Sequence, residues 1–293
     1  MIFEVIVMNK LRTNKEKCIK IAVSGKVHHP TMKLPGYRIS SDGIPRIVPA
    51  VGGITYNAKL GDSCMGIKGD HIEPSVSMKN SDAKEDAALN ILACVGNEAV
   101  VISGDAKGKK GVVTGKHGGI DHVMVHFDDE TLEQMTSDDK IQIKAFGQGL
   151  ELLDYPEVFV MNIDPEVLAK LPIKQEDKTL HVPVKAIVPA KLMGSGLGSS
   201  DMHSGDYDIM TRDESTLKEY GLDNLCYGDF VFILDHCNTY GADYIQGAGT
   251  FGIIIHSDSY VSGHGPGVTV LLTSRKPHLK PFIDENANLI NYI

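Results

Sequence analysis

Short apolar runs separated by glycine and proline dominate this sequence, and they restrict the chain to folds built from short strands. Glycine accounts for 30 of the 293 residues, and tight turns and bulges need backbone conformations that glycine adopts most easily. Together these features predict a β-rich α+β fold with mostly antiparallel strands and few short helices. Examples of the runs are RIVPAVGGITY, AVVISG, DHVMVHF, HVPVKAIVPA and PGVTVLLTS.

Residues 97–150 form the most regular part of this pattern. Four strand-like runs follow one another there, with Gly-rich hairpin connections between them. They predict a small SH3-like β-barrel, since the strand–loop–strand pattern resembles that of barrels in some ribosomal and transcription proteins. Residues 1–96 and 151–293 would then form one main β-rich domain around it. We expect the small barrel to have its own core of Val101, Val113, Val123 and Val125.

Outside the barrel, capping signals predict a few short helices. Ser81 is placed to cap a helix that Gly96 ends, and Asp164 followed by Pro165 begins another. A third short helix should stop at Gly221. The N-terminal run IFEVIVM indicates a first strand, and we expect the C-terminal run FIDENANLINYI to pack on a neighbouring subunit of a homo-oligomer.

The charge balance and the cysteine content restrict the partners and the compartment. The formal net charge is −9, which opposes a general nucleic-acid binder and an anionic membrane surface, since both need positive charge on the protein. Five cysteines without a CxxC pair do not favour a disulfide framework. No apolar run is long enough to span a membrane, and the N-terminus lacks the features of a signal peptide. We therefore expect a cytoplasmic protein that acts on or binds a small molecule.

Residues 69–75, GDHIEPS, hold the first candidate site. Asp70, His71 and Glu73 lie within four positions, and in an extended backbone His71 and Glu73 would point to one face. A histidine and a carboxylate on one face can share a metal or a proton, so these three residues are candidates for catalysis, with Glu73 or His71 as the general base. The alternative is an exposed polar turn.

The run SSDMHSGDYD at 199–208 holds the second candidate. Asp201 and His203 lie two positions apart, as do Asp206 and Asp208, so each pair would point the same way from an extended backbone. Alternating aspartates also occur in calcium loops, but this run lacks the spacing and the final glutamate of an EF-hand. The alternative is a solvated acidic loop with local turns.

Two further places deliver histidine where an apolar run ends. Asp235 and His236 follow FVFIL, and His256 follows GIII. His264 stands between glycines, whose missing side chains would let a ligand approach closely. Burying a histidine costs free energy unless it is hydrogen-bonded or bound to a metal, so each of these residues needs a partner.

Aspartate and histidine together suit a divalent metal such as zinc or manganese. The chain has no HExxH, P-loop or GxSxG motif that would indicate another chemistry. We expect at least three of the histidines at 71, 203, 236, 256 and 264 to meet in one pocket with Asp201 or Asp235, unless each histidine is bonded locally. The predicted metal ligands are Asp201, His203, Asp235, His236, His256 and His264.

Four segments resemble a known family of uncharacterised bacterial and archaeal proteins, domain of unknown function 4438. They are GDHIEPSVSM at 69–78, GKKGVVTGKHGGIDHVMVHF at 108–127, GLGSSDMHSGDYDIMT at 196–211 and HSDSYVSGHGPGVTVLLTS at 256–274. The resemblance spans almost the whole chain and implies a β-rich fold with the middle segment as a small barrel. It implies no reaction. One departure is Ser75, where the resemblance leads us to expect glycine in a turn.

Two functions are open at this point. The first is a divalent-metal hydrolase that acts on a C–N bond, such as an amide, in a small molecule, because a bound metal polarises a carbonyl and acidifies its water. The second is a protein that binds a metabolite or a partner without turnover. Nucleic-acid binding through the barrel is a weaker form of the second. The residues that would supply its positive charge are Lys107, Lys109, Lys110 and Lys116.

Overall fold

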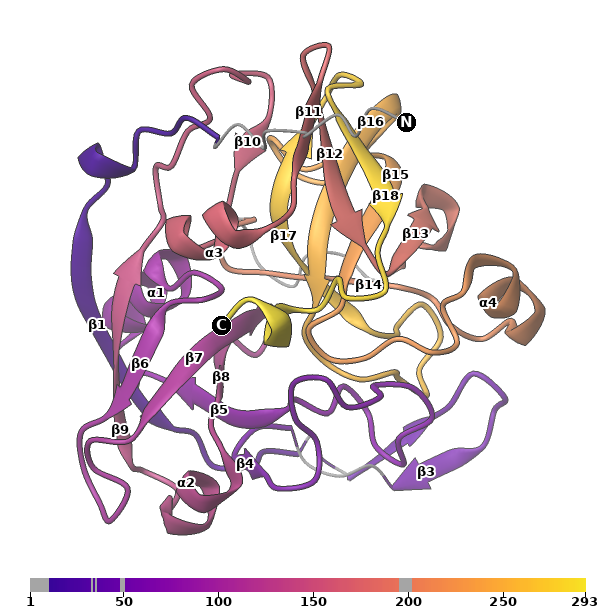
Figure 1. Cartoon of the computed structure of the whole chain (residues 1–293). Helices are drawn as coiled ribbons and strands as arrows, with labels where there is room; N and C mark the ends of the chain where they lie inside the picture. Colours follow the sequence, from indigo (N-terminus) through magenta and orange to yellow (C-terminus); the bar gives the residue numbers. More distant parts are fainter. Residues whose placement is uncertain (1–10, 33, 35, 48–50, 195–201) are drawn as a thin grey trace, which may run out of the picture.

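The computed structural model of the protein (Figure 1) describes residues 11–32, 34, 36–47, 51–194 and 202–293. Within these residues the chain forms short strands, most of them antiparallel, and a few short helices, which confirms the predicted β-rich fold class. The strands gather into two bodies, a barrel from the N-terminal half and a group of sheets from the C-terminal half (Figure 1). The predicted first strand, IFEVIVM, lies outside the described residues.

Six strands close into an antiparallel barrel at the lower left of Figure 1. Each strand pairs with its neighbour in the order β1-β9-β6-β7-β8-β5, and β5 pairs back with β1. The short strand β4 (Ile54–Thr55) extends the sheet beside β5. The bounds of the barrel strands are Lys20–Val27 (β1), Ser75–Lys79 (β5), Glu98–Val101 (β6), Lys110–His117 (β7), His122–His126 (β8) and Lys140–Phe146 (β9).

Aliphatic side chains fill the interior of this barrel. Val27 of β1, together with Val76 and Met78 of β5, packs in the same core as the side chains from residues 97–150. The predicted segment therefore supplies β6 to β9, and the barrel closes only with two strands from earlier in the chain. The predicted core residues are all completely buried in it: Val101, Val113, Val123 and Val125.

Two sheets make up the C-terminal half, at the upper right of Figure 1. The larger has the order β10-β17-β16-β15-β13, with β14 also paired to β17, and the smaller has the order β11-β12-β18. Two pairings, β13 with β15 and β12 with β18, are parallel. The bounds are Phe159–Val160 (β10), Lys174–Glu176 (β11), Thr179–Val184 (β12), Ala186–Pro189 (β13), Tyr207–Asp208 (β14), Phe230–Cys237 (β15), Asp243–Ile254 (β16), Gly267–Ser274 (β17) and Leu279–Ile283 (β18).

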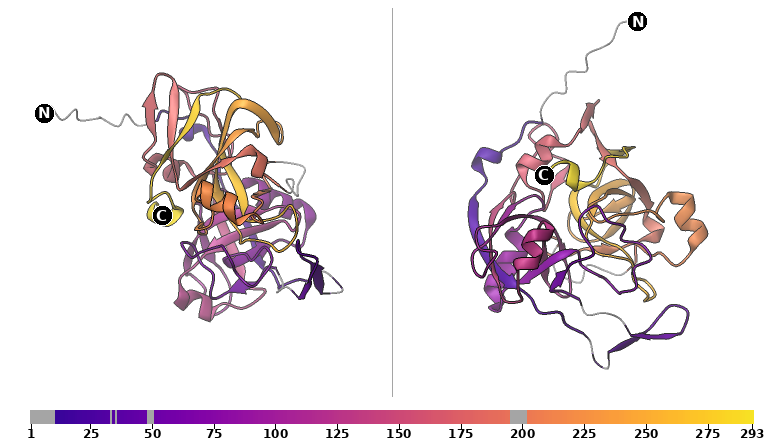
Figure 2. Two further views of the ribbon diagram at one scale, coloured as in Figure 1. Left: turned by 90° about the vertical axis from the view of Figure 1, so that its right-hand side faces the viewer. Right: turned by 60° about the horizontal axis from the view of Figure 1, so that its bottom comes forward.

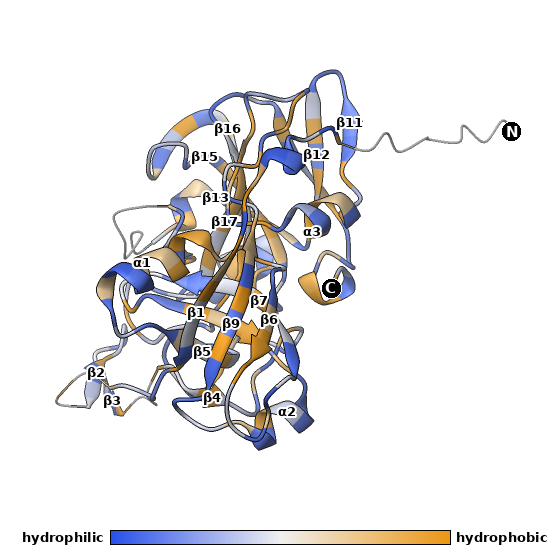
Figure 3. Ribbon diagram, turned by 90° about the vertical axis from the view of Figure 1, so that its left-hand side faces the viewer, coloured by the Kyte–Doolittle hydropathy of each residue, from blue (hydrophilic) through white to orange (hydrophobic). Residues whose placement is uncertain are grey.

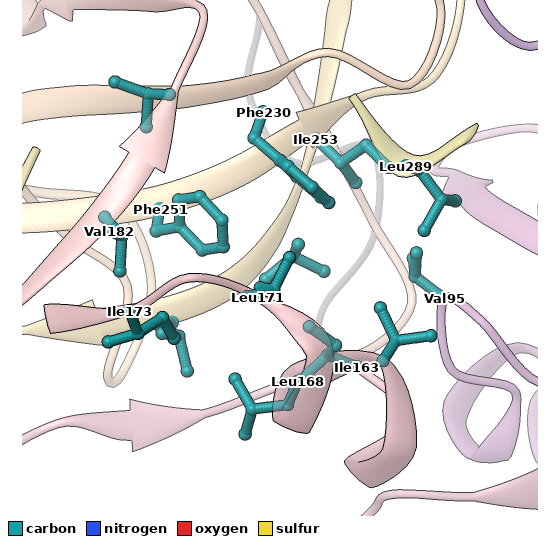
Figure 4. Packing of buried hydrophobic residues seen from close by; sticks show 14 of the residues in the cluster. Val95, Ile163, Leu168, Leu171, Ile173, Val182, Phe230, Phe251, Ile253 and Leu289 are labelled. Carbon is teal, nitrogen blue, oxygen red and sulfur yellow. The ribbon is translucent and has the colours of Figure 1, made fainter. Parts of the chain in front are cut away.

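A large apolar core lies between these sheets, helix α3 (Pro165–Lys170) and the C-terminal segment. Figure 4 shows Phe230 and Phe251 in this core, with Leu168 of α3 and Leu289 of the C-terminal segment nearby. Leu289 and Ala287 are buried by their own chain, and Asn288 donates hydrogen bonds to Tyr227 O and to the Asp229 carboxylate. The C-terminal run thus packs within its protomer, and the homo-oligomer stays a prediction.

The helices begin at aspartates that cap their free backbone N–H groups. Helix α1 (Ala83–Leu92) starts at Asp82, whose carboxylate accepts from two backbone N–H groups, so the cap predicted at Ser81 lies one residue later. Helix α3 (Pro165–Lys170) starts at Asp164 as predicted. Helix α4 (Glu214–Tyr220) ends at Gly221, which has a φ of 65°. None of the described helices is long and apolar enough to cross a membrane.

The remaining elements lie at the surface. Strands β2 (Tyr37–Ile39) and β3 (Pro45–Ile47) form a hairpin that projects from the barrel side (Figure 2). Helix α2 (Asp129–Gln134) is hydrophilic, whereas hydrophobic residues concentrate along the strands of both bodies (Figure 3). Single 3-10 turns occur at Lys15–Lys17, Ala190–Leu192 and Leu289–Asn291.

The two bodies meet along β7 and β17. Gly115 lies so close to Ile255 that a Cβ at this position would overlap the isoleucine side chain. The backbone N–H of Lys116 donates to the Thr269 hydroxyl at 3.2 Å, and that hydroxyl donates to Lys116 O at 3.1 Å. This contact fixes the end of β7 against the start of β17, which is where the polar side chains of the chain gather.

Candidate metal centre

Six histidine and aspartate side chains meet at the junction of the two bodies. Two come from the barrel side, since His71 precedes β5 and His117 is the last residue of β7. His256 is completely buried, and the side chain of His264 is 34% exposed, so the cluster opens toward solvent on the His264 side. The four that come from the C-terminal half are Asp206, Asp208, His256 and His264.

One Asp208 oxygen faces two histidines. Asp208 Oδ2 lies 2.8 Å from His264 Nδ1 and 3.2 Å from His71 Nε2, and the two ring nitrogens lie 3.1 Å apart. Three donor atoms that are all within 3.2 Å of one another form a compact triangle. The other Asp208 oxygen, Oδ1, is not part of this triangle and faces His256.

The second oxygen of Asp208 faces His256. His256 Nε2 lies 3.4 Å from Asp208 Oδ1 and 3.0 Å from Asp206 Oδ2. A donor atom of His117 lies within 4.8 Å of donor atoms of Asp206 and His256. Gly267 makes this approach possible, because a Cβ there would overlap both the Asp206 carboxylate and the His256 ring.

Hydrogen bonds at the far side of two rings set their tautomers. His71 Nδ1 lies 3.1 Å from Asp70 Oδ1, and His256 Nδ1 lies 2.9 Å from the carbonyl oxygen of Ser257. The shorter contacts with these oxygens favour N–H on Nδ1, although Gly267 N also approaches His256 Nδ1 at 3.3 Å. The neutral rings would then present their Nε2 lone pairs to Asp206 and Asp208, and a proton or a metal ion could lie between them.

Glu73 lies behind His117 and not among the six side chains of the cluster. It is 1% exposed, and its carboxylate oxygens lie 2.5 Å from His117 Nδ1 and 2.8 Å from His122 Nδ1. The Ser77 hydroxyl donates to it as well, and His122 Nε2 lies 2.8 Å from His28 Nδ1. Both oxygens of Glu73 are thus occupied, which makes it a group that orients His117 and His122.

The pKa values of the cluster follow from burial opposed by these contacts. Burial alone would raise the pKa of Asp208, but hydrogen bonds with His256, His264 and His71 outweigh it and hold that pKa well below its usual value. Burial likewise disfavours the charged forms of His256 and His71, yet hydrogen bonds with the aspartates raise the pKa of both rings. For Asp70, hydrogen bonds with His71 and Ser259 overcome burial and lower its pKa to about 2. In the metal-free protein the cluster therefore retains protons on its histidines.

The local backbone around His71 is held in an uncommon conformation. His71 has a φ of 53° and Ser75 a φ of 58°, both in the left-handed region that favours glycine. This explains why glycine is expected at position 75. The Ser75 hydroxyl accepts a hydrogen bond from Phe127 N at 3.1 Å, a contact that glycine could not make.

The structure brings together some of the predicted site residues and leaves others apart. His71, His256 and His264 meet in the cluster with Asp70 beside them, but their carboxylate partners are Asp206 and Asp208. The backbone carbonyl of His203 accepts from Lys116 Nζ at 2.5 Å. Asp201 lies outside the described residues.

Asp235 and His236 do not join the cluster, because β15 continues past them to Cys237. Asp235 sits at a bulge with a φ of 53°, and its carboxylate accepts from Gly247 N at 2.7 Å. His236 is buried, and its Nδ1 accepts from Asn238 Nδ2 at 3.0 Å. These two residues lie within a strand and not at its end.

Four residues of the cluster and its surroundings lie outside the predicted ligand set. Asp206 and Asp208 share the i, i+2 spacing of Asp201 and His203, so spacing alone does not choose between the pairs. His117 precedes a Gly-Gly turn that is typical of a hairpin connection, yet it ends an apolar strand just as His256 follows one. His122 begins the next strand, and no motif in the sequence indicates its contact with Glu73.

The lysines considered for anion recognition by the barrel are largely engaged. Lys109 Nζ pairs with Glu130 at 2.8 Å, and Lys110 Nζ pairs with Glu98 at 2.8 Å. Lys116 is completely buried, and its ammonium donates to Asn162 Oδ1 at 2.8 Å. These contacts neutralise the charges of Lys109 and Lys110 and bury the charge of Lys116.

Similarity to known proteins extends over almost the whole chain. Residues 37–169 match the family described as domain of unknown function (DUF4438), N-terminal, and residues 170–293 match its C-terminal counterpart. A solved structure described as "Crystal structure of TM1086" is similar over 97% of this chain and 100% of that one, with 46% sequence identity and a TM-score of 0.92. No curated protein matches the sequence significantly. This chain belongs to the DUF4438 family.

Proposed function

We propose that this chain is a divalent-metal-dependent enzyme that hydrolyses a C–N bond of the amide type in a small molecule. The observation that carries the proposal is the meeting of four histidines and two aspartates, from segments far apart in the sequence, at one buried junction. Buried lone pairs and carboxylates are unfavourable without a cation, so a fold that assembles them repeatedly implies a bound ion.

The roles of the side chains follow from their contacts. His71, His264 and Asp208, with His256 and Asp206, supply the donor atoms for the metal. Asp70 accepts from the far nitrogen of His71 and fixes its tautomer, which is the usual role of a carboxylate behind a metal-bound histidine. Glu73 acts in the same way on His117, because both of its oxygens are already bonded. This replaces the prediction that Glu73 is a general base.

The reaction class rests on the chemistry of such a donor set. A zinc or manganese ion held by imidazole and carboxylate groups polarises a carbonyl oxygen and lowers the pKa of bound water. The donor atoms lie nearest to solvent on the side of His264, whose side chain is 34% exposed, while His256 is completely buried. An amide has the polarisable carbonyl that this chemistry requires.

The test is metal dependence of turnover. Purified protein is stripped with a chelator, restored with Zn²⁺ or Mn²⁺, and assayed for amine release from a panel of N-acyl amino acids, small peptides and cyclic amides. We expect turnover to disappear on chelation and to return with one of the ions. His256→Ala should abolish both metal retention and turnover.

His181→Ala is the matched control. His181 lies on β12, pairs loosely with Glu176 at 3.6 Å, and is outside the cluster, so its loss should change neither quantity. Turnover that survives complete chelation would overturn the metal-enzyme proposal. A protein that retains metal but turns over no amide would instead be the metabolite-binding protein of the second hypothesis.

A further inference from the structure

We propose that the cluster holds two divalent cations, bridged by the two carboxylate oxygens of Asp208. This inference rests on the proposed function, because both ions would belong to the same centre. It goes further in assigning a second metal site and in dividing the donor groups between the two ions.

The first position lies between His71, His264 and one oxygen of Asp208. Adjacent ligands that are about 2.0–2.2 Å from one ion are roughly 2.8–3.6 Å from one another in octahedral or tetrahedral geometry. The separations of 2.8, 3.1 and 3.2 Å among Asp208 Oδ2, His264 Nδ1 and His71 Nε2 fall close to this range. These three atoms form one face of a coordination shell.

The second position lies between His256, Asp206 and the other oxygen of Asp208. His256 Nε2 is 3.0 Å from Asp206 Oδ2 and 3.4 Å from Asp208 Oδ1, again the spacing of ligands on one ion. His117 is the fourth member, because its Nδ1 bonds to Glu73 and its other ring nitrogen remains for the metal.

The orientation of Asp208 separates two ions from one. Its Oδ2 faces His71 and His264, whereas its Oδ1 faces His256. A carboxylate that chelated a single ion would direct both oxygens at the same set of ligands. The two oxygens thus face different histidines, while a donor atom of His71 also lies within 4.8 Å of one of His256.

The charge of the cluster suits two ions. Asp70, Glu73, Asp206 and Asp208 are each at most 5% exposed, and with neutral histidines they carry four negative charges. Protons on the histidines or metal ions can offset this charge, and two divalent ions balance all four carboxylates when the histidines are neutral.

The consequence is a different way of activating the substrate. Two ions about 3.5–4 Å apart can hold the attacking oxygen and the carbonyl oxygen at the same time. Each ion then needs fewer protein ligands, which agrees with the small donor sets on the two oxygens of Asp208: His71 and His264 on one, and His256 with Asp206 on the other.

The experiment measures metal content and metal–metal coupling in the full-length protein. Stripped protein is loaded with Zn²⁺ for elemental analysis after gel filtration, and with Mn²⁺ for electron paramagnetic resonance. We expect two zinc ions per chain, and a coupled manganese signal in place of the six lines of isolated Mn²⁺. His264→Ala and Asp206→Asn should each reduce the content toward one ion and restore the isolated signal.

The controls distinguish failure of this inference from failure of the proposed function. His181→Ala should retain two ions, and far-ultraviolet circular dichroism checks that every variant is folded. One zinc per chain in the wild-type protein, with isolated manganese lines, would overturn the second ion and leave the metal-enzyme proposal standing. A chain that retains no zinc would overturn both.

Discussion

The buried His236 offers a test of the structure that is independent of any metal. Its side chain accepts a hydrogen bond from Asn238, contacts the Thr250 hydroxyl at 3.3 Å, and packs edge-on against Tyr207 with ring centroids 5.4 Å apart. Burial lowers the pKa of His236 from 6.5 to about 4. The folded protein therefore keeps this ring neutral at pH values where the unfolded chain protonates it.

The magnitude follows from proton linkage. The folded-state pKa is depressed, so this residue's contribution to stability is complete above pH 6.5 and is lost as the pH falls toward 4. Between pH 7 and pH 5 the loss is about 2 kcal/mol in the free energy of unfolding. His236→Gln keeps a hydrogen-bond acceptor and removes the titration, so the variant should not show this loss.

The assay is urea unfolding of metal-free wild type and His236→Gln at pH 7, 6 and 5. The variant should be less stable at pH 7, and the gap should narrow by about 2 kcal/mol at pH 5, since all other titrating groups are common to both proteins. A gap that stays constant across this range would refute the assignment of His236 as a buried neutral residue. The zinc content of the His236→Gln variant should equal that of the wild type, because His236 lies outside the cluster.

Five further predictions address the junction and the assembly. Gly267→Ala should lower the zinc content measured by elemental analysis, because the added Cβ would force Asp206 and His256 apart. Asp70→Asn should weaken zinc affinity by roughly 10–100-fold in calorimetric titration, as loss of an orienting carboxylate commonly does. In the wild-type protein, zinc affinity should fall as the pH decreases below 7, because the raised pKa values of His71 and His256 let protons compete with the metal. Lys116→Met should destabilise the fold by about 3 kcal/mol in urea unfolding, because it leaves Asn162 Oδ1 and backbone carbonyls without their buried donor. Light scattering at micromolar concentration should give an oligomer mass, and a monomer mass would refute the predicted homo-oligomer.

The fold class could be predicted because it depends on local signals. Alternating apolar residues between glycines indicate short strands whatever their partners, and the four core valines of the barrel were identified in this way. Barrel closure could not be predicted in the same way. The pairing of β1 with β9 joins Lys20 to Phe146, and no periodicity within either strand indicates a partner so distant in sequence.

The site could be predicted only in part from local signals. His256 follows the end of a strand, and His264 is indicated by its flanking glycines. His236 has the same sequence signal as His256 but lies inside a strand, because a bulge at Asp235 lets β15 continue. His117 stands before a Gly-Gly turn, which a hairpin connection explains equally well. A local pattern states what a residue could do, whereas the tertiary fold decides which of several equivalent residues face one another.

The proposed centre draws its donor atoms from both family regions of the chain. His71 and His117 belong to the N-terminal family region, 37–169, and Asp206, Asp208, His256 and His264 belong to the C-terminal region, 170–293. Each region alone would carry only part of the donor set. Its histidines or carboxylates would lose their partners, and the surface that the other region buries would be exposed. The two parts are held together next to His117. Gly115 packs closely on Ile255, and Lys116 forms backbone hydrogen bonds with the Thr269 hydroxyl. The junction therefore serves both to join the two bodies and to bring together the donor atoms of the proposed metal centre.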